Sequence, residues 1–328
     1  MVIRRIAVVG AGIAGLACAN RLVACGHEVK VYDKGRGVGG RAATRRIRVG
    51  ASDLRFDHGA QFLTARDPAF RSLVDRLVSA GAIAIYPNTV TSITTNERAL
   101  LPDEPRFVGT PGMSGMAKAL AEGLDIETSC QVTECIKEAE GWRLALSTGA
   151  RTSHFDNVVI AVPAEQATAL LLPISPSLAR EAVAARTSPC WAAMLAFSPA
   201  IQASFAAARV RDSSPLAWVS RMSGNHDDHS CWVLHTTTDW SIENIDRPAE
   251  WVAEELARAF SKLADIGVQP LHITAHRWRY AQVQVAVGTP FAWDADLGIG
   301  VCGDWRLGPR IELAWQSGDA LGSAIGSR

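Results

Sequence analysis

The sequence is poor in lysine and tyrosine and has no long apolar run. Of its 328 residues, 5 are lysine and 3 are tyrosine, whereas 28 are arginine. So few lysines restrict the catalytic roles that an amine side chain can fill. No segment approaches the roughly 20 apolar residues that span a bilayer, so we expect no transmembrane helix and no membrane partner.

Neither sign of charge is in excess, and the cysteines form no pattern. The 33 basic and 33 acidic residues balance, which gives no reason to expect a nucleic-acid partner. Seven cysteines, an odd number without metal-ligand spacing, predict free thiols in a reducing compartment. The histidines from His226 to His276 also lack ligand spacing, so no metal site is predicted. An apolar strand begins close to the first residue, so we expect no signal peptide and a cytoplasmic location.

A glycine-rich turn follows this first strand. Residues Gly10-Ala11-Gly12-Ile13-Ala14-Gly15 come after the apolar residues 6–9 and open an amphipathic stretch. Glycines at these positions permit a tight turn and let backbone N–H groups approach a pyrophosphate at the positive end of a helix. Asp33 ends the next predicted strand, where a carboxylate can accept hydrogen bonds from ribose hydroxyls. This βαβ unit predicts a dinucleotide site with Gly10, Gly12, Ala14, Gly15 and Asp33 as candidate ligands.

A second glycine-rich segment, Arg36-Gly37-Val38-Gly39-Gly40-Arg41, lies shortly after Asp33. One such turn is shared by nicotinamide and flavin enzymes, but two together favour FAD as a resident group. Lys34, Arg36, Gly40 and Arg41 join the candidate cofactor ligands. No cysteine occurs in the closing segment at residues 316–319, so we expect FAD to bind noncovalently.

The first and last parts of the chain read as strands and helices of one α/β domain, whereas the middle of the chain differs in composition. A predicted strand at residues 298–302 and a helix after residue 312 complete the domain that the first residues begin. The length of 328 residues suits two domains. We therefore predict an α/β flavoprotein oxidase fold, in which a doubly wound, Rossmann-like FAD domain carries an inserted substrate domain of mixed or antiparallel sheet. The expected FAD domain comprises residues 1–80, 105–170 and 285–328, and the substrate domain residues 81–104 and 171–284.

With these motifs the chain resembles the FAD-dependent amine oxidase superfamily and, within it, most closely the bacterial renalases. The resemblance covers nearly the full length. Beyond the two glycine-rich segments, its marks are Phe56-Asp57-His58-Gly59-Ala60-Gln61-Phe62, Pro111-Gly112-Met113-Ser114, Cys231-Trp232-Val233-Leu234-His235-Thr236-Thr237, Arg277-Trp278-Arg279-Tyr280-Ala281 and Gly303-Asp304-Trp305.

The resemblance implies further cofactor contacts. Arg41 would lie on the FAD pyrophosphate, and Asp304 at the ribityl or pyrophosphate region. Gly59, Ala60 and Gln61 would pass beside the isoalloxazine, and the last helix would point its N-terminus at the flavin. The cofactor residues implied in this way are Asp57, Gly59, Ala60, Gln61, Val132, Asp304 and Ile311.

The resemblance also implies a reaction. Renalase-like enzymes oxidise the 2- and 6-dihydro isomers of NAD(P) to NAD(P)⁺, with hydride passing to flavin N5 and O2 as the final acceptor, giving H2O2. Such a substrate is already a strong hydride donor, so no catalytic side chain is predicted. The expected partners are this small molecule and O2, and the protein is expected to be a monomer.

Candidate substrate residues follow from the same motifs. His235 shares a strand face with Val233, opposite to Trp232 and Leu234, and either lines the substrate pocket or is hydrogen-bonded within the sheet. Trp278 and Tyr280 would form an aromatic wall, with Arg277 and Arg279 on the other face. The candidate substrate-binding residues are His235, Tyr280, Trp278, Arg186, Asn96 and Gln61, although Arg186 and Asn96 also suit a plain surface role.

Two other functions remain open. Many amine and polyamine oxidases place a lysine, through a water, at flavin N5, and none of Lys30, Lys34, Lys118, Lys137 and Lys262 is well placed for that. A non-catalytic protein that binds FAD or another dinucleotide is the second alternative.

Overall fold

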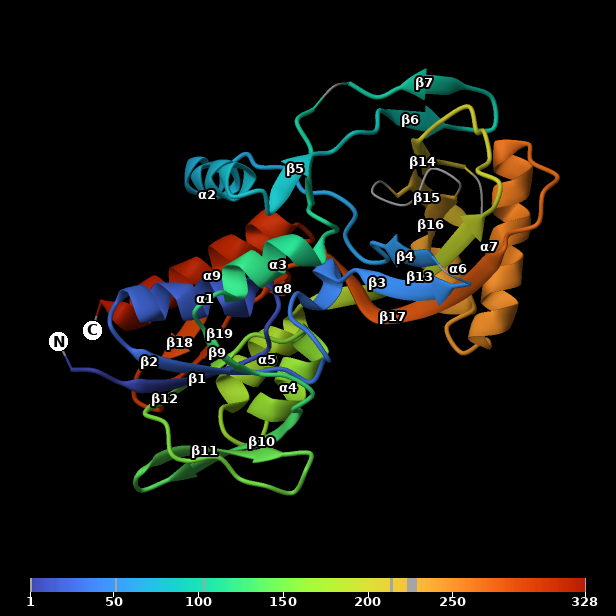
Figure 1. Ribbon diagram of the computed structural model, residues 1–328. Coiled ribbons are helices and arrows are strands. Elements are labelled where there is room, and N and C mark those ends of the chain that lie inside the picture. Colours follow the sequence, from blue (N-terminus) through green and yellow to red (C-terminus); the bar gives the residue numbers. More distant parts are fainter. Residues whose placement is uncertain (1, 51, 103, 213–214, 223–228, 328) are drawn as a thin grey trace.

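In the computed structural model the described residues are 2–50, 52–102, 104–212, 215–222 and 229–327, so His226 lies outside them. The helices cover both faces of one sheet and one face of another (Figure 1). They are α1 (Ile13–Ala24), α2 (Pro68–Ser79), α3 (Ser114–Ala121), α4 (Ala164–Leu171), α5 (Pro176–Ala184), α6 (Thr238–Glu243), α7 (Ala249–Ala264), α8 (Asp304–Leu307) and α9 (Ile311–Gly326), with a 3₁₀ turn η1 (Gly40–Ala42).

The first sheet has six strands in the order β18-β19-β12-β1-β2-β9. They are β18 (Ala292–Asp294), β19 (Ile299–Val301), β12 (Asn157–Ile160), β1 (Arg5–Val9), β2 (Glu28–Tyr32) and β9 (Asp125–Glu127). All neighbours are parallel except β18 and β19. Because the chain leaves β1 for β2 on one side and places β12 on the other, the sheet is doubly wound.

Alternate residues of β1 enter different cores, as a strand buried on both faces requires. Ile6 and Val8 pack in the core with α1, α3 and α9, whereas Ala7 and Val9 pack in the core with α4 and α5. The hairpin of β10 (Val132–Glu138) and β11 (Gly141–Leu146) closes this second layer. Residues 171–284 are expected in the substrate domain, but α5 packs here with the first sheet, so the boundary on this side falls after α5.

The second sheet has seven strands in the order β17-β13-β16-β15-β14-β6-β7. They are β17 (His272–Val285), β13 (Arg186–Phe197), β16 (Ser230–Thr236), β15 (Leu216–Arg221), β14 (Ala207–Val210), β6 (Val90–Ile93) and β7 (Arg98–Leu100). Only β14 and β6 pair in parallel, so the sheet is mixed. The expected fold class is confirmed.

Different elements cover the two faces of the second sheet. Helix α7 buries Val252, Leu256 and Phe260, spaced four residues apart on one stripe, against one face. A ribbon of β3 (Arg45–Val49) and β4 (Ser52–Phe56) packs on the other face. A further ribbon joins β5 (Ile83–Ile85) to β8 (Phe107–Gly109).

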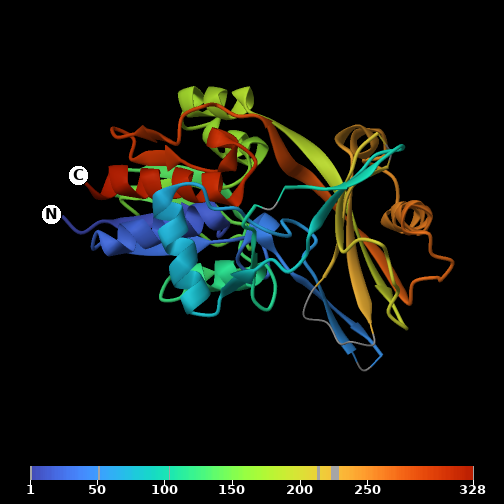
Figure 2. The ribbon, with the colours of Figure 1, turned by 90° about the horizontal axis from the view of Figure 1, so that it is seen from above.

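Figure 2 shows how the two sheets are joined. The long strands β13 and β17 run side by side from the first sheet into the second, and both termini lie at the end of the molecule remote from α7 (Figures 1 and 2). None of the helices formed by the described residues has the length and apolar character needed to cross a membrane.

Candidate functional site

The glycine-rich turn between β1 and α1 is packed so closely that glycine is required at two positions. Gly10 has φ +108°, and a Cβ there would lie 2.6 Å from the carbonyl oxygen of Ala161. A Cβ on Gly15 would lie 1.9 Å from the carbonyl oxygen of Gly10. Gly12 differs, because a Cβ there would meet nothing within 4 Å. The turn is therefore tight on its protein side and open at Gly12, at the N-terminus of α1, as a phosphate cradle requires.

Asp33 holds this turn in place. One of its carboxylate oxygens accepts a hydrogen bond from the backbone N–H of Ala11 at 2.6 Å, and the other accepts from Gly35 at 2.6 Å. The carboxylate therefore fixes the first glycine-rich segment and the residue just before the second, and it keeps further lone pairs for a ribose hydroxyl. Beside it, Lys34 donates to Gln166, and Arg36 is exposed.

The second glycine-rich segment touches the first. Gly39 donates its N–H to the carbonyl of Ala11 at 2.8 Å, and Gly39 and Gly40 both have positive φ. Ala14 lies on the far side of the turn, where α9 approaches so closely that a Cβ on Gly318 would be 1.9 Å from the Ala14 carbonyl. Ile311 begins α9 and is half-buried.

Arg41 joins the cofactor side to the second sheet. Its guanidinium donates to Asp304 at 2.7 Å and to the carbonyls of Tyr280 and Ala281 at 3.4 and 3.2 Å. Those carbonyls lie where the pairing of β17 with β13 shifts register opposite Pro189, which has no N–H to give. Tyr280 therefore contacts Arg41 through its backbone carbonyl.

The segment from Asp57 to Gln61 passes between these two parts. Asp57 is buried and accepts from the Thr44 hydroxyl at 2.5 Å and from the N–H of Met113 at 2.9 Å. Burial raises the pKa of Asp57, and these two hydrogen bonds oppose that effect. A Cβ on Gly59 would lie 2.0 Å from the Arg41 carbonyl, and Ala60 donates its N–H to the same carbonyl at 2.9 Å. The side chain of Asp57 thus positions the segment through protein contacts.

Two side chains of the second sheet hold the carbonyl of His58. Nε2 of His235 lies 3.0 Å from this oxygen, and the indole N–H of Trp278 donates to it at 2.9 Å. The expectation that His235 shares a face with Val233, opposite Trp232 and Leu234, is confirmed, since the latter two face α7. His235, for which a pocket role and a hydrogen bond within the sheet were both left open, and Trp278, a candidate for the aromatic wall, bind with their polar atoms the backbone of the segment that precedes Gln61.

The imidazoles here are uncharged at neutral pH. Burial, helped by His276 and Arg45, lowers the pKa of His58 to about 3. Burial and Arg45 lower the pKa of His276 to about 4, and burial lowers that of His235. Trp278 lies within ring contact of both His58 and His276, at centroid distances of 5.0 and 4.4 Å.

Gln61 lies at the other end of the segment and is buried. Its side-chain oxygen accepts from the indole N–H of Trp218 at 2.5 Å. Its amide nitrogen is buried and has no partner among the residues that the structure describes. Phe62 packs on both Trp218 and Tyr86, at centroid distances of 5.4 and 5.5 Å. We call Asp57–Gln61, with Trp218, His235, His276 and Trp278, the junction.

Three other predicted residues lie apart from the junction. Val132 is buried at the start of β10. Arg186 is exposed at the start of β13, and Asn96 is exposed in the turn between β6 and β7, at the opposite edge of the sheet from Trp278. Strand order separates Asn96 from the junction, so the structure does not bring it to the substrate residues.

The sequence reasoning missed Trp218, His276 and Arg45. Nδ1 of His276 lies 3.4 Å from the Arg45 guanidinium, and Trp218 pairs with His235 across β15 and β16. Their only signal in the sequence is alternation: Trp218 stands two residues before the buried Ser220, and His276 two residues before Trp278.

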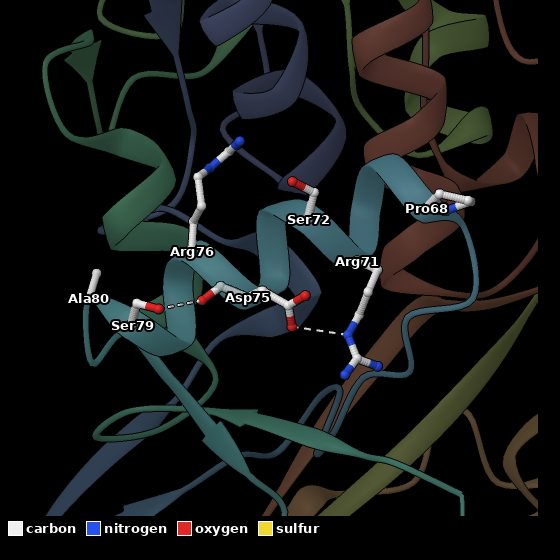
Figure 3. A pocket seen from close by; sticks show the side chains of 7 residues that line it. All are labelled: Pro68, Arg71, Ser72, Asp75, Arg76, Ser79 and Ala80. Atoms are coloured by element: carbon white, nitrogen blue, oxygen red, sulfur yellow. Dashed lines mark hydrogen bonds and ion pairs between the residues drawn. The ribbon is translucent and has the colours of Figure 1, made fainter.

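Two other candidate sites carry no chemistry. A recess of about 790 Å³ is lined only by residues of α2 and by Ala80, which follows it. Figure 3 shows these side chains. No second element converges there, and Arg71 and Asp75 pair with each other at 3.0 Å. Among the described residues, Glu138, Glu140 and His154 could hold a metal ion, but the 2.7 Å hydrogen bond between His154 and Glu138 accounts for this group.

Comparison with known proteins settles the family. Residues 8–77 match the NAD(P)-binding Rossmann-like domain, and residues 78–292, more than half of the chain, match the flavin containing amine oxidoreductase family. The chain belongs to the flavin-containing amine oxidoreductases.

Individual relatives agree in fold. A protein from Exiguobacterium sp. 255-15 assigned as a protoporphyrinogen oxidase superposes with a TM-score of 0.78 over 100% of this chain and 99% of its own, at 12% identity. Cyclohexylamine oxidase from Brevibacterium oxydans IH-35A gives a TM-score of 0.75 over 99% of both chains, at 12% identity. In sequence, protoporphyrinogen oxidase 2 of Arabidopsis thaliana is 39% identical over 74 residues, which cover 23% of this chain and only 14% of that protein.

The residues present fit the flavin that this family contains, and the cofactor is FAD, as expected. The cradle at Gly12 is open, Asp33 fixes the first glycine-rich segment, which Gly39 joins to the second, and the unpartnered amide of Gln61 lies where they meet the second sheet. Bound FAD would contact the open face of these segments and Arg41.

Proposed function

We propose that this family member is an FAD-dependent oxidase of the renalase type, which converts the 2- and 6-dihydro isomers of NAD(P) to NAD(P)⁺. The observation that carries the proposal is that the side-chain donors of the junction are uncharged. These donors are indoles, an amide and imidazoles whose pKa values burial lowers. Such groups suit an uncharged dihydropyridine ring with a carboxamide, because each can bond or stack without a counter-ion.

The positions of the lysines support the same substrate class. Lys30 pairs with Glu127 at the edge of the first sheet, and Lys34 bonds Gln166. Lys137 donates to the carbonyl of Leu297, and Lys118 and Lys262 lie on α3 and α7. No lysine therefore reaches the junction among the described residues, and a lysine-assisted amine oxidation has no residue to use.

The protein's part in this reaction is placement. Bound FAD would supply the hydride acceptor, and O2 would reoxidise it with release of H2O2. His235 and Trp278 fix the backbone of the segment between Asp57 and Gln61, and Gly59 allows this segment to lie against Arg41. Holding a strong hydride donor against its acceptor is sufficient for rate enhancement without an acid or base.

Oxidation of a primary amine is the second candidate. It is favoured by the family to which the chain belongs and by the fold shared with cyclohexylamine oxidase. Asp57 is the one carboxylate of the junction, and Thr44 and Met113 both donate to the same oxygen of it, Oδ1.

Anaerobic mixing separates the candidates. The purified flavoprotein is mixed with NADH that contains the minor dihydro isomers and, separately, with a panel of amines, and the oxidised-flavin absorbance is followed. We expect bleaching with the isomers only, and recovery of the colour with H2O2 in air. Bleaching by an amine would establish the second candidate instead, and no bleaching by either would favour a non-catalytic FAD-binding protein.

We also propose that the protein acts as a monomer on small molecules and O2 in the cytoplasm, without nucleic-acid or membrane partners. Balanced charge and seven cysteines, none of them in a disulfide, support this. Size-exclusion chromatography with light scattering tests the oligomeric state.

A further inference from the structure

The amide of Gln61 is held in one orientation by a group that can only donate. Trp218 gives its indole N–H to the Gln61 oxygen at 2.5 Å. An indole has no acceptor for the amide's own N–H groups. If the amide were flipped, the NH2 group of Gln61 would face the N–H group of Trp218, and neither could accept a hydrogen bond. The oxygen must therefore face Trp218 and the NH2 group must face away from it.

This orientation leaves a donor without a partner. Gln61 is 5% exposed, and its amide nitrogen has no hydrogen bond to any of the described residues. A buried N–H group without an acceptor destabilises a fold, so native proteins retain few of them, and mostly for a reason.

The indole itself is firmly held. Phe62 packs on its ring and on Tyr86, whose hydroxyl lies 2.7 Å from that of Ser220. Ser220 is two residues from Trp218 on β15 and therefore on the same face. These contacts prevent Trp218 from turning away and releasing the amide.

We propose that Trp218 is a positioning residue that presents the NH2 group of Gln61 to an acceptor atom on a bound planar heterocycle. The position favours such a ring, since Gln61 follows Gly59, which lies against the carbonyl of Arg41 at the edge of the glycine-rich segments. The acceptor belongs either to the flavin ring or to the carboxamide of a nicotinamide, and the chemistry of recognition is the same. The assignment of the acceptor to a nicotinamide carboxamide rests on the proposed function.

Two variants test the inference on the FAD-loaded protein. Trp218→Phe keeps a ring against Phe62 but removes the N–H, and Gln61→Glu keeps an acceptor for Trp218 but removes both amide donors. Trp240→Phe is the matched control. Trp240 lies on α6 and stacks on Trp251 of α7, so this substitution also changes an indole to a phenyl ring but does so outside the junction. The readouts are the flavin absorbance spectrum, the flavin midpoint potential and the Kd of NAD⁺.

The two sources give different results. If the flavin is the acceptor, both test variants shift the flavin band and potential, and the Kd of NAD⁺ stays constant. If the carboxamide is the acceptor, the spectrum stays constant and the Kd rises roughly threefold to tenfold, as expected for one lost hydrogen bond. Thermal unfolding checks that neither variant acts through stability alone.

The inference is overturned if either variant folds, binds FAD and matches Trp240→Phe in all three readouts. Should Trp218→Phe fail to fold, Gln61→Glu decides alone. If the unsubstituted protein binds no NAD⁺, the proposed function fails, and the flavin spectrum and potential then decide the inference by themselves.

Discussion

The turn at Gly10–Gly15 and the junction both hold a short loop in one position, but with different groups. In the turn, backbone packs directly on backbone, and any Cβ at Gly15 would lie 1.9 Å from a carbonyl oxygen. At the junction, side chains from β16 and β17 reach one backbone carbonyl, that of His58. At Gly10 and Gly15 the turn therefore tolerates no added atoms, whereas the junction depends on atoms that must be present.

The largest effect should come from adding one carbon to the turn. Gly15→Ala forces Gly10 to move, and we expect a loss of about 4 kcal/mol or more in the free energy of unfolding, together with loss of FAD. Gly12→Ala is the matched control, since its Cβ meets nothing and should leave the apoprotein stable. Urea unfolding measures both, and equal stabilities would show that the turn is not limited by packing.

The next effect should come from removing the carboxylate that fixes the turn. Asp33→Ala leaves the N–H groups of Ala11 and Gly35 without their acceptor, at a cost of about 3 kcal/mol, and should lower the FAD content of the purified protein. Asp33→Asn keeps one oxygen and should be intermediate. An alanine variant that purifies with full FAD would refute the assignment of Asp33 to the cofactor site.

Acid should weaken the junction before the turn. The folded-state pKa values of His58 and His276, about 3 and 4, lie below the usual value for histidine. The unfolded chain therefore binds more protons between pH 6.5 and 4, and stability falls as the pH drops through this range while remaining level above it. Between pH 6.5 and 5 His58 should contribute about 2 kcal/mol to that fall, and His276, which is less buried, should contribute less because solvent screens its charge. Unfolding of His276→Gln should depend less steeply on pH, and identical slopes would contradict the account.

The smallest effect concerns the two donors to the His58 carbonyl. Either His235→Phe or Trp278→Phe leaves one donor in place and should cost about 1 kcal/mol. The double variant leaves the carbonyl unpartnered and should cost more than the two together. Denaturant unfolding of the unsubstituted protein, the two single variants and the double variant gives the coupling free energy between the two donors. Strictly additive losses in the free energy of unfolding would mean that the donors do not share the acceptor in solution.

The same contrast explains how much the sequence could predict. The turn is local, so the spacing of Gly10, Gly12 and Gly15 and the position of Asp33 predict it and the doubly wound sheet. The junction depends on strand pairing, which brings Trp218 beside His235. It also depends on tertiary packing, which brings His58 from a distant segment against His276 and Trp278.

Strand order also explains which residues the sequence could not place. Asn96 stands in a polar turn that alternation cannot assign to either edge of a sheet, and the structure puts it at the edge remote from Trp278. His235 was read correctly for its face but not for its partner, because a backbone carbonyl such as that of His58 leaves no mark in a sequence.

The central claim is that the turn retains FAD while the junction governs its reduction. The most direct test is anaerobic reduction of the double variant His235→Phe/Trp278→Phe by the dihydronicotinamide isomers, with the FAD content measured in the same sample. The account predicts full FAD content and a reduction rate at least about tenfold lower than that of the unsubstituted protein. An unchanged reduction rate, or loss of FAD from a folded double variant, would contradict it.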